Sequence, residues 1–114
     1  MNFLNSKAAL SNNILLKDAE IDGNLSSLTD LHLEGIINGD ISCKAKIYLS
    51  EQASIKGNVI SKCAEISGKV KGNINCIELL DIKSTAIIEG DILCGRLILE
   101  DGASIKGKYS LKSH

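Results

Sequence analysis

One five-residue pattern recurs six times along this chain of 114 residues: an apolar residue, any residue, glycine, any residue and a second apolar residue. Its six glycines are separated by 16, 18, 15, 18 and 17 residues. A sequence that repeats itself at a nearly fixed period predicts a solenoid, in which one structural unit stacks on the next. The pattern begins at Ile21, Ile37, Ile55, Val70, Ile88 and Ile105.

Apolar residues alternate with other residues inside each repeat, which is typical of a β-strand with one buried side. We expect repeats of 15 to 18 residues to hold three short strands and three bends. The sequence therefore predicts an all-β, single-domain, three-sided parallel β-helix of about six rungs, where a rung is one circuit of the chain. The full rungs are residues 21–36, 37–54, 55–69, 70–87 and 88–104; a half rung precedes them and a partial rung begins at residue 105.

The same alternation predicts which side chains point inward and where the domain ends. In the fifth rung Ile92, Cys94, Leu97 and Leu99 are expected to point inward. The predicted organisation is a flexible N-terminal tail (1–13), a β-helix domain (14–111) and a short C-terminal tail (112–114). The extra glycines Gly35 and Gly68 are expected to supply the positive φ of tight corners.

A 33-residue spacing separates Gly35 from Gly68 and Cys43 from Cys76, and this period also suits ankyrin repeats. The apolar period of two and the lack of a 3.6-residue stripe argue against those helical repeats.

Composition and charge limit the function classes. The net charge of −1 predicts no attraction to nucleic acid. No apolar run approaches the roughly 20 residues that a membrane-spanning helix needs, and the first ten residues are too polar for a secretory signal. These features predict a cytoplasmic protein with four reduced thiols.

The residues that could carry chemistry are expected to be structural. Cys43, Cys76 and Cys94 fall in one inward column with Ser27 and Ser61, so they are expected to be buried and inert. No C-x-x-C pair is present, and the sequence predicts no metal, no cofactor and no catalytic residue, hence no enzyme. Polar residues that follow the repeat glycines are expected to form a hydrogen-bonded ladder: Asn24, Asp40, Asn58, Asn73, Asp91 and Lys108.

Three motifs together resemble the bactofilin family. They are the I-x-G-x-I strands, the doubled V-x-G-x-V-x-G pattern of residues 66–74, and the A-x-I-x-G corners at Ala19, Ala53, Ala86 and Ala103. The resemblance covers about four fifths of the chain, which departs from the family in its short, proline-free flanks. It implies a right-handed β-helix that polymerises end to end without nucleotide. It also implies a bacterial scaffold along the inner membrane that positions cell-wall-modifying enzymes and affects cell shape.

The ends of the predicted coil support self-association on physical grounds. An exposed sheet edge is a template for pairing, and a solenoid that does not associate usually has a polar cap. Here apolar residues occupy both terminal rungs, where we expect them to be uncovered. The predicted polymer contacts are Leu15, Ile21 and Leu25 at one end, and Ile105, Tyr109 and Leu111 at the other.

The first residues offer a candidate membrane contact, because the resemblance implies that a short apolar N-terminus with a lysine can bind lipid. The residues concerned are Met1, Phe3, Leu4 and Lys7. This would place the protein peripherally on the inner membrane; the alternative is a disordered leader.

Two rival functions remain. A passive β-helix could bind a protein or carbohydrate on one flat face without polymerising. A hexapeptide-repeat acyltransferase is a left-handed β-helix, but rungs of 15 and 16 residues break its six-residue register. No rung carries the loop insertion that such an enzyme needs beside its histidine base.

Overall fold

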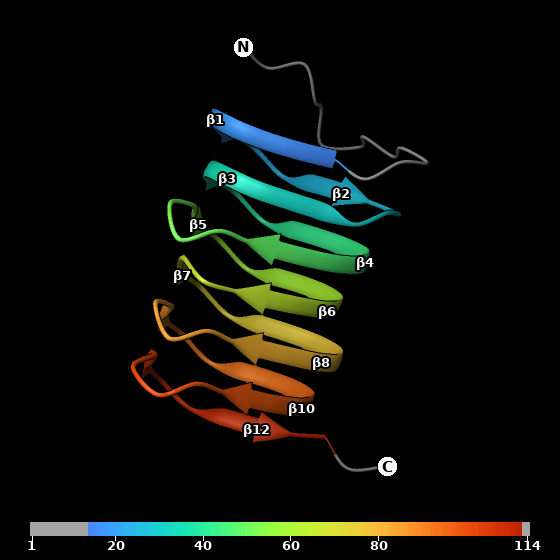
Figure 1. The fold of residues 1–114 in the computed structure, drawn as a ribbon. Helices are drawn as coiled ribbons and strands as arrows, with labels where there is room; N and C mark the ends of the chain where they lie inside the picture. Colours follow the sequence, from blue (N-terminus) through green and yellow to red (C-terminus); the bar gives the residue numbers. More distant parts are fainter. Residues whose placement is uncertain (1–13, 113–114) are drawn as a thin grey trace.

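The polypeptide winds as a stack of strands whose hydrogen bonds run from each circuit to the next (Figure 1). The computed structural model describes residues 14–112, with only the backbone of residues 14–17 and 19. This part of the chain contains twelve strands and no helix. The strands are β1 (Ile14–Asp22), β2 (Leu25–Ser27), β3 (Leu31–Asn38), β4 (Ile41–Leu49), β5 (Ser54–Lys56), β6 (Val59–Ile66), β7 (Lys69–Lys71), β8 (Ile74–Ile82), β9 (Ile87–Glu89), β10 (Ile92–Leu99), β11 (Ser104–Lys106) and β12 (Tyr109–Leu111).

All strand pairs in this range are parallel, and their register divides the coil into three faces. The long strands bend between two faces, as β4 does between Cys43 and Lys46. The first face holds residues 25–27, 41–43, 59–61, 74–76, 92–94 and 109–111. The second face holds 14–17, 31–33, 46–49, 63–66, 79–82 and 96–99. The third face holds 20–22, 36–38, 54–56, 69–71, 87–89 and 104–106.

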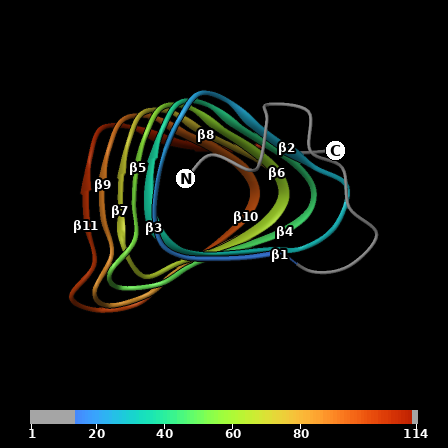
Figure 2. The ribbon, with the colours of Figure 1, turned by 90° about the horizontal axis from the view of Figure 1, so that it is seen from above.

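The coil is right-handed and three-sided, as the resemblance implied. Seen from the N-terminal end, the chain runs clockwise around a three-cornered outline while it recedes from the viewer (Figures 1 and 2). The predicted all-β parallel β-helix is therefore confirmed.

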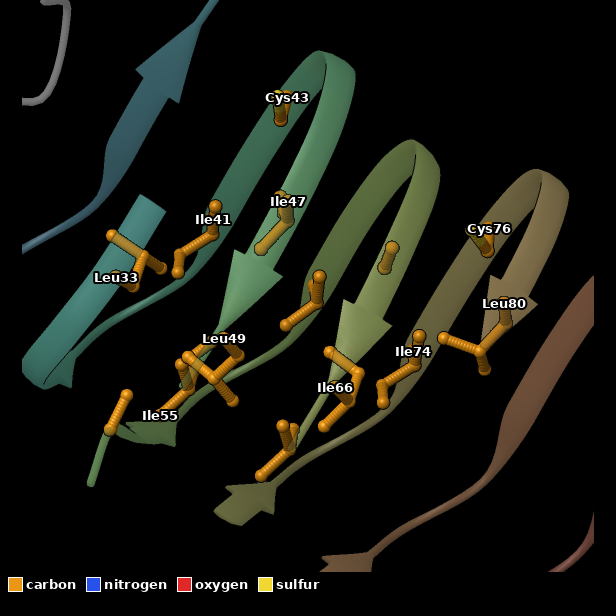
Figure 3. Close-up of a cluster of buried hydrophobic side chains, with 14 of the residues drawn as sticks. Leu33, Ile41, Cys43, Ile47, Leu49, Ile55, Ile66, Ile74, Cys76 and Leu80 are labelled. Atoms are coloured by element: carbon orange, nitrogen blue, oxygen red, sulfur yellow. The ribbon is translucent and has the colours of Figure 1, made fainter. Parts of the chain in front are cut away.

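The interior is made of aliphatic columns that run along the coil axis. On the first face the column is Leu25, Ile41, Val59, Ile74 and Ile92, all buried. Figure 3 shows side chains from all three faces pointing into the same narrow space. Branched aliphatic side chains fill such a space well, because identical positions in successive rungs lie only about 4.8 Å apart.

The repeat glycines form a column of their own in which no side chain fits. A Cβ atom on Gly39, Gly57, Gly72, Gly90 or Gly107 would lie closer than 3.0 Å to the carbonyl oxygen of the glycine one rung earlier. Real Cβ atoms do not make such contacts. The carbonyl of the preceding rung therefore occupies the space of a side chain along this column, and the recurrence of glycine in the sequence has a steric cause.

Positive φ occurs at different glycines from those predicted. Gly35 and Gly68 do not have positive φ, so that prediction was wrong. Positive values belong to most repeat glycines instead, from 130° at Gly23 to 157° at Gly57. Gly68 is required for a different reason: a Cβ there would collide with the carbonyl oxygens of Ser50 and Ala53.

We predict that Gly72→Ala destabilises the protein much more than Gly23→Ala does. Both glycines have positive φ, but a Cβ on Gly23 meets no atom within 4 Å, whereas one on Gly72 meets the carbonyl of Gly57. Urea denaturation followed by circular dichroism should show a loss of about 1–3 kcal/mol for Gly23→Ala from backbone strain alone. The loss for Gly72→Ala should be larger by roughly 1–3 kcal/mol of overpacking. Equal losses would show that the close approach between rungs is not the constraint.

The polar ladder beside the glycines is present as predicted. The side-chain oxygen of each ladder residue accepts a hydrogen bond from the backbone N–H of the residue one rung later. The bonds run from Asp40 N–H to Asn24 (2.9 Å), Asn58 to Asp40 (2.8 Å), Asn73 to Asn58 (3.0 Å), Asp91 to Asn73 (3.0 Å) and Lys108 to Asp91 (3.1 Å). Lys108 has no side-chain acceptor, so the ladder ends there.

The small polar column also lies where predicted. Cys43, Cys76 and Cys94 are free, buried thiols in register with Ser27 and Ser61. The Cys76 sulfur lies within hydrogen-bonding distance of the carbonyls of Leu79 (3.1 Å) and Lys62 (3.4 Å), which share its single S–H donor close to the bend of β8. The Cys43 thiol donates to the carbonyl of Thr29 (3.3 Å). These side chains therefore satisfy backbone groups at the bends.

Alkaline pH should destabilise the fold through Cys76. Burial raises the pKa of the Cys76 thiol from 9.0 to about 11. Between these values the unfolded chain loses the proton while the folded chain keeps it, so stability is full below pH 9 and falls as the pH rises toward 11. Relative to Cys76→Ser, the wild type should lose roughly 2 kcal/mol across this window. If the free energy of unfolding changes with pH in the same way for the two proteins between pH 8 and 11, the assignment is contradicted.

Candidate self-association surface at the ends of the coil

The coil has an open edge at its C-terminal end. The strand β12 pairs only with β10, β11 pairs only with β9, and residues 96–99 of β10 pair only with β8. Backbone N–H and C=O groups on the outer side of these segments therefore have no partner strand in the described part of the chain. An edge of this kind can pair with another chain.

Side chains at this end belong to columns that are buried everywhere else. Tyr109 continues the column of Ile92 but is 55% exposed, and Leu111 continues the column of Cys94 but is 59% exposed. Leu99, in register with the buried Ile82, is 46% exposed. Because no further rung covers them, inward-pointing residues form an apolar end patch, which consists of Leu97, Leu99, Ile105, Tyr109 and Leu111.

The predicted C-terminal contact residues Ile105, Tyr109 and Leu111 thus lie together in the end patch. Leu97 and Leu99 were predicted to point inward but were not recognised as part of this surface. The signal was available, because the last strand of the described chain, β12, lies on the first face and does not cover residues 96–99.

At the N-terminal end the expectation of uncovered residues was wrong for two of three positions. Ile21 and Leu25 are only 5% and 1% exposed. Both point into the interior and continue the columns of Ile37 and Ile41. Leu15 pairs with His32 through its backbone, and its side chain is outside the described structure. The candidate membrane residues Met1, Phe3, Leu4 and Lys7 also lie outside the described residues.

The two ends differ in charge. Residues 18–43 contain six carboxylates and no lysine or arginine, whereas residues 102–112 contain three lysines and no carboxylate. Attraction between such ends is screened over about 8 Å at physiological salt.

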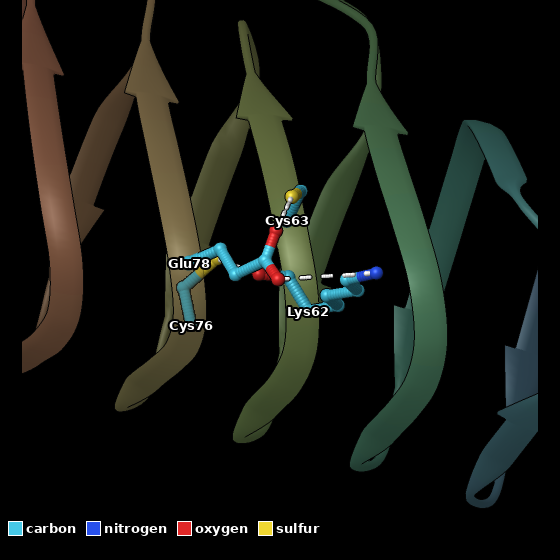
Figure 4. A network of polar contacts seen from close by, with 4 residues as sticks. All are labelled: Lys62, Cys63, Cys76 and Glu78. Atoms are coloured by element: carbon cyan, nitrogen blue, oxygen red, sulfur yellow. Dashed lines mark hydrogen bonds and ion pairs between the residues drawn. The ribbon is translucent and has the colours of Figure 1, made fainter.

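A polar network at the corner between the first and second faces brings together the ionisable side chains of Lys62, Cys63 and Glu78 (Figure 4). Glu78 lies 3.9 Å from the Lys62 ammonium, and its other oxygen is 3.8 Å from the sulfur of Cys63. Lys62 and Glu78 are both more than half exposed, and an ion pair of this kind contributes at most about 1 kcal/mol. The Cys63 thiol thus donates a weak hydrogen bond to a carboxylate that already pairs with Lys62.

Within residues 14–112, no group of three or more His, Cys, Asp or Glu side chains is arranged to hold a metal ion. His32 points outward, as predicted, and stacks on Tyr48 with ring centroids 4.4 Å apart. The same range holds no helix with the length and apolar character to cross a membrane. Among the described residues, the end patch is the apolar surface that continues the buried columns of the coil.

Comparison with known proteins also indicates self-association. Residues 13–110 match the bactofilin family, which is described as polymer-forming cytoskeletal. The chain is 30% identical over 102 residues to bactofilin BacO of Myxococcus xanthus (strain DK1622), a match that covers 90% of this chain and 81% of BacO. It is also 30% identical over 108 residues to bactofilin BacP of the same organism, which covers 95% of this chain but only 45% of BacP.

No solved structure gives a significant match. The family match spans nearly the whole described coil, and the repeated glycines and four of the five end-patch residues lie within it. This chain belongs to the bactofilin family of polymer-forming cytoskeletal proteins.

Proposed function

We propose that this chain is a subunit of a bacterial cytoskeletal scaffold and assembles end to end into filaments without nucleotide. The single observation that carries the proposal is the end patch. Its side chains occupy columns that are buried in every earlier rung, and they end half exposed beside an unpaired strand edge. A further rung from another copy would cover both at once.

The energy available at this contact is adequate for assembly. Full burial of a large apolar side chain contributes about 1.5–3 kcal/mol. The end patch has five apolar residues, and each is already partly buried in the free subunit, so only the area that is still exposed contributes. Several kcal/mol of apolar burial are therefore available, to which edge hydrogen bonds add. Part of this is offset by the loss of translational and rotational freedom on association.

Replacing Tyr109 with arginine tests the proposal. Tyr109→Arg places a charge in the apolar end patch, and desolvating that charge opposes the contact. We expect the wild type to form filaments in negative-stain electron microscopy without nucleotide, and the variant to remain as small particles. The matched control is Ser104→Arg, which adds the same charge in the preceding strand β11, on the outward side of the third face.

Filaments of unchanged length and abundance in Tyr109→Arg would contradict this use of the end patch. Uniform small particles from the wild type would contradict polymerisation itself and favour a passive binding module.

We propose further that the N-terminal residues Met1, Phe3, Leu4 and Lys7 attach the filament to the inner face of the membrane, where the scaffold would organise cell-wall and cell-shape machinery. Two or three apolar side chains contribute only a few kcal/mol, roughly 0.8 per buried CH₂ group, so one subunit would bind weakly. A filament presents many copies at once, and this multivalency raises the overall affinity.

Vesicle flotation separates the membrane proposal from polymerisation, because free filaments sediment while vesicle-bound filaments float. We expect the full chain to float with anionic vesicles and a variant lacking residues 1–10 to sediment while still forming filaments. Flotation of both proteins to the same extent would contradict a role for these residues in lipid binding.

A further inference from the structure

The most exposed large apolar side chains outside the end patch gather near one corner of the coil. Among the described residues these are Leu28 (58% exposed), Ile77 (56%) and Ile60 (52%). Leu28 and Ile77 lie at the corner between the first and second faces, and Ile60 lies on the first face beside it. Exposed apolar patches mark interaction sites, so this corner is a candidate contact surface.

Ile60 and Ile77 line a shallow groove of about 360 Å³ at this corner. Its other lining residues include the exposed side chains of Lys44, Lys62 and Glu78. Glu78 lies 3.9 Å from the Lys62 ammonium, so these two charges partner each other (Figure 4). A lysine can lay its methylene stem on an apolar surface and keep its ammonium in water. The groove can therefore take up apolar side chains without burying an unpaired charge.

We propose that the N-terminal tail, residues 1–13, lies along this corner and places Phe3 and Leu4 in the groove of the same subunit. These two residues cannot contact lipid while they occupy the groove, so docking holds back membrane attachment. The apparent affinity for lipid falls in proportion to the fraction of tails that remain free. This consequence rests on the proposed membrane role of the tail, whereas the docking itself does not.

The tail joins the coil at the corner where the groove lies. Ile14, where β1 begins, pairs through its backbone with Leu31, the first second-face residue of the following rung. The strand β1 thus starts on the side of the coil where β4, β6 and β8 bend (Figure 1). From Ile14, the exposed Leu28 lies one rung along the coil, and Ile60 and Ile77 lie three and four rungs along it.

The tail is long enough to reach the groove. Four rungs at about 4.8 Å span about 19 Å, which about six residues of extended chain cover at about 3.3 Å each. Leu4 and Phe3 precede Ile14 by ten and eleven residues, so they reach the groove with residues to spare. Leu10 precedes Ile14 by four residues and reaches as far as about 13 Å, so it can cover Leu28 on the way.

Covalent attachment favours the tail over a separate partner as the occupant. The groove is lined by residues of three rungs, and three rungs at about 4.8 Å by three residues at about 3.3 Å give roughly 140 Å². A stable interface between separate chains uses about 800 Å² per partner, so the groove alone does not hold one. A segment of the same chain acts at an effective concentration in the millimolar range and can occupy so small a surface. Lys7 is the only charged residue of the tail, so docking removes little charge from water.

A tryptophan in place of Phe3 tests the docking, because the chain has no tryptophan of its own. We expect the Phe3→Trp protein, without lipid, to emit at a shorter wavelength than the same protein unfolded in urea, at every protein concentration. Adding Ile60→Lys or Ile77→Lys puts a charge in the groove and should shift the emission to that of the unfolded protein. The matched control is Ile87→Lys, an outward isoleucine of the third face that is 38% exposed, which should leave the emission unchanged.

An emission of Phe3→Trp equal to that of the unfolded protein, or one that both groove substitutions leave unchanged, would overturn the docking. A short-wavelength emission that disappears on dilution would place the tail on another copy and would also contradict docking within one subunit. Failure of the membrane proposal is distinguishable, because the emission is measured without lipid and vesicle flotation is a separate measurement.

Discussion

The close approach of successive backbones along the glycine column is the constraint on which the rest of this structure depends. At Gly39, Gly57, Gly72, Gly90 and Gly107 the carbonyl of the previous rung occupies the space of a Cβ atom. Rungs can therefore stack at the spacing of parallel strands, about 4.8 Å, around the whole circuit. Once that spacing holds, equivalent residues fall into columns, and each column can be aliphatic, thiol or hydroxyl, or a polar ladder. Each type of column satisfies a different need: apolar burial, backbone hydrogen bonding at the bends, or ladder bonding on the surface.

A stack built in this way has no intrinsic end. Every rung covers the one before it and is covered by the next, so the last rung exposes whatever its columns carry. Here the columns stay apolar to the final strand, and Tyr109 and Leu111 are exposed where Ile92 and Cys94 are buried. The polar ladder behaves differently, because Lys108 closes it with a side chain that accepts no bond. The C-terminal end thus keeps its capacity for apolar contact, which is the property expected of a polymer-forming family.

The sequence predicted the parts of this structure that depend on local alternation. Inward and outward positions, the thiol column and the outward His32 follow from a period of two, and the register confirms them. The predictions that failed depend on the path of the backbone in three dimensions. Gly35 and Gly68 were assigned positive φ because glycine often adopts it, yet Gly68 is needed for a close approach to Ser50 and Ala53. Ile21 and Leu25 were expected to be uncovered because they come first in the chain, but sequence position alone does not decide burial in a terminal rung. Leu99 was missed for a related reason, since its exposure depends on which face the last described strand occupies.

A filament of this coil has two kinds of surface for contacts, the ends along its axis and the three flat faces across it. In the proposed filament, contacts along the axis depend on the end patch, and contacts across the axis depend on the flat faces. Six rungs at about 4.8 Å and three residues at about 3.3 Å give each flat face roughly 300 Å² per subunit. This is well below the roughly 800 Å² per partner that a stable interface uses, so a single flat face does not hold two free subunits together. The charged second and third faces keep their ion-paired groups in contact with water.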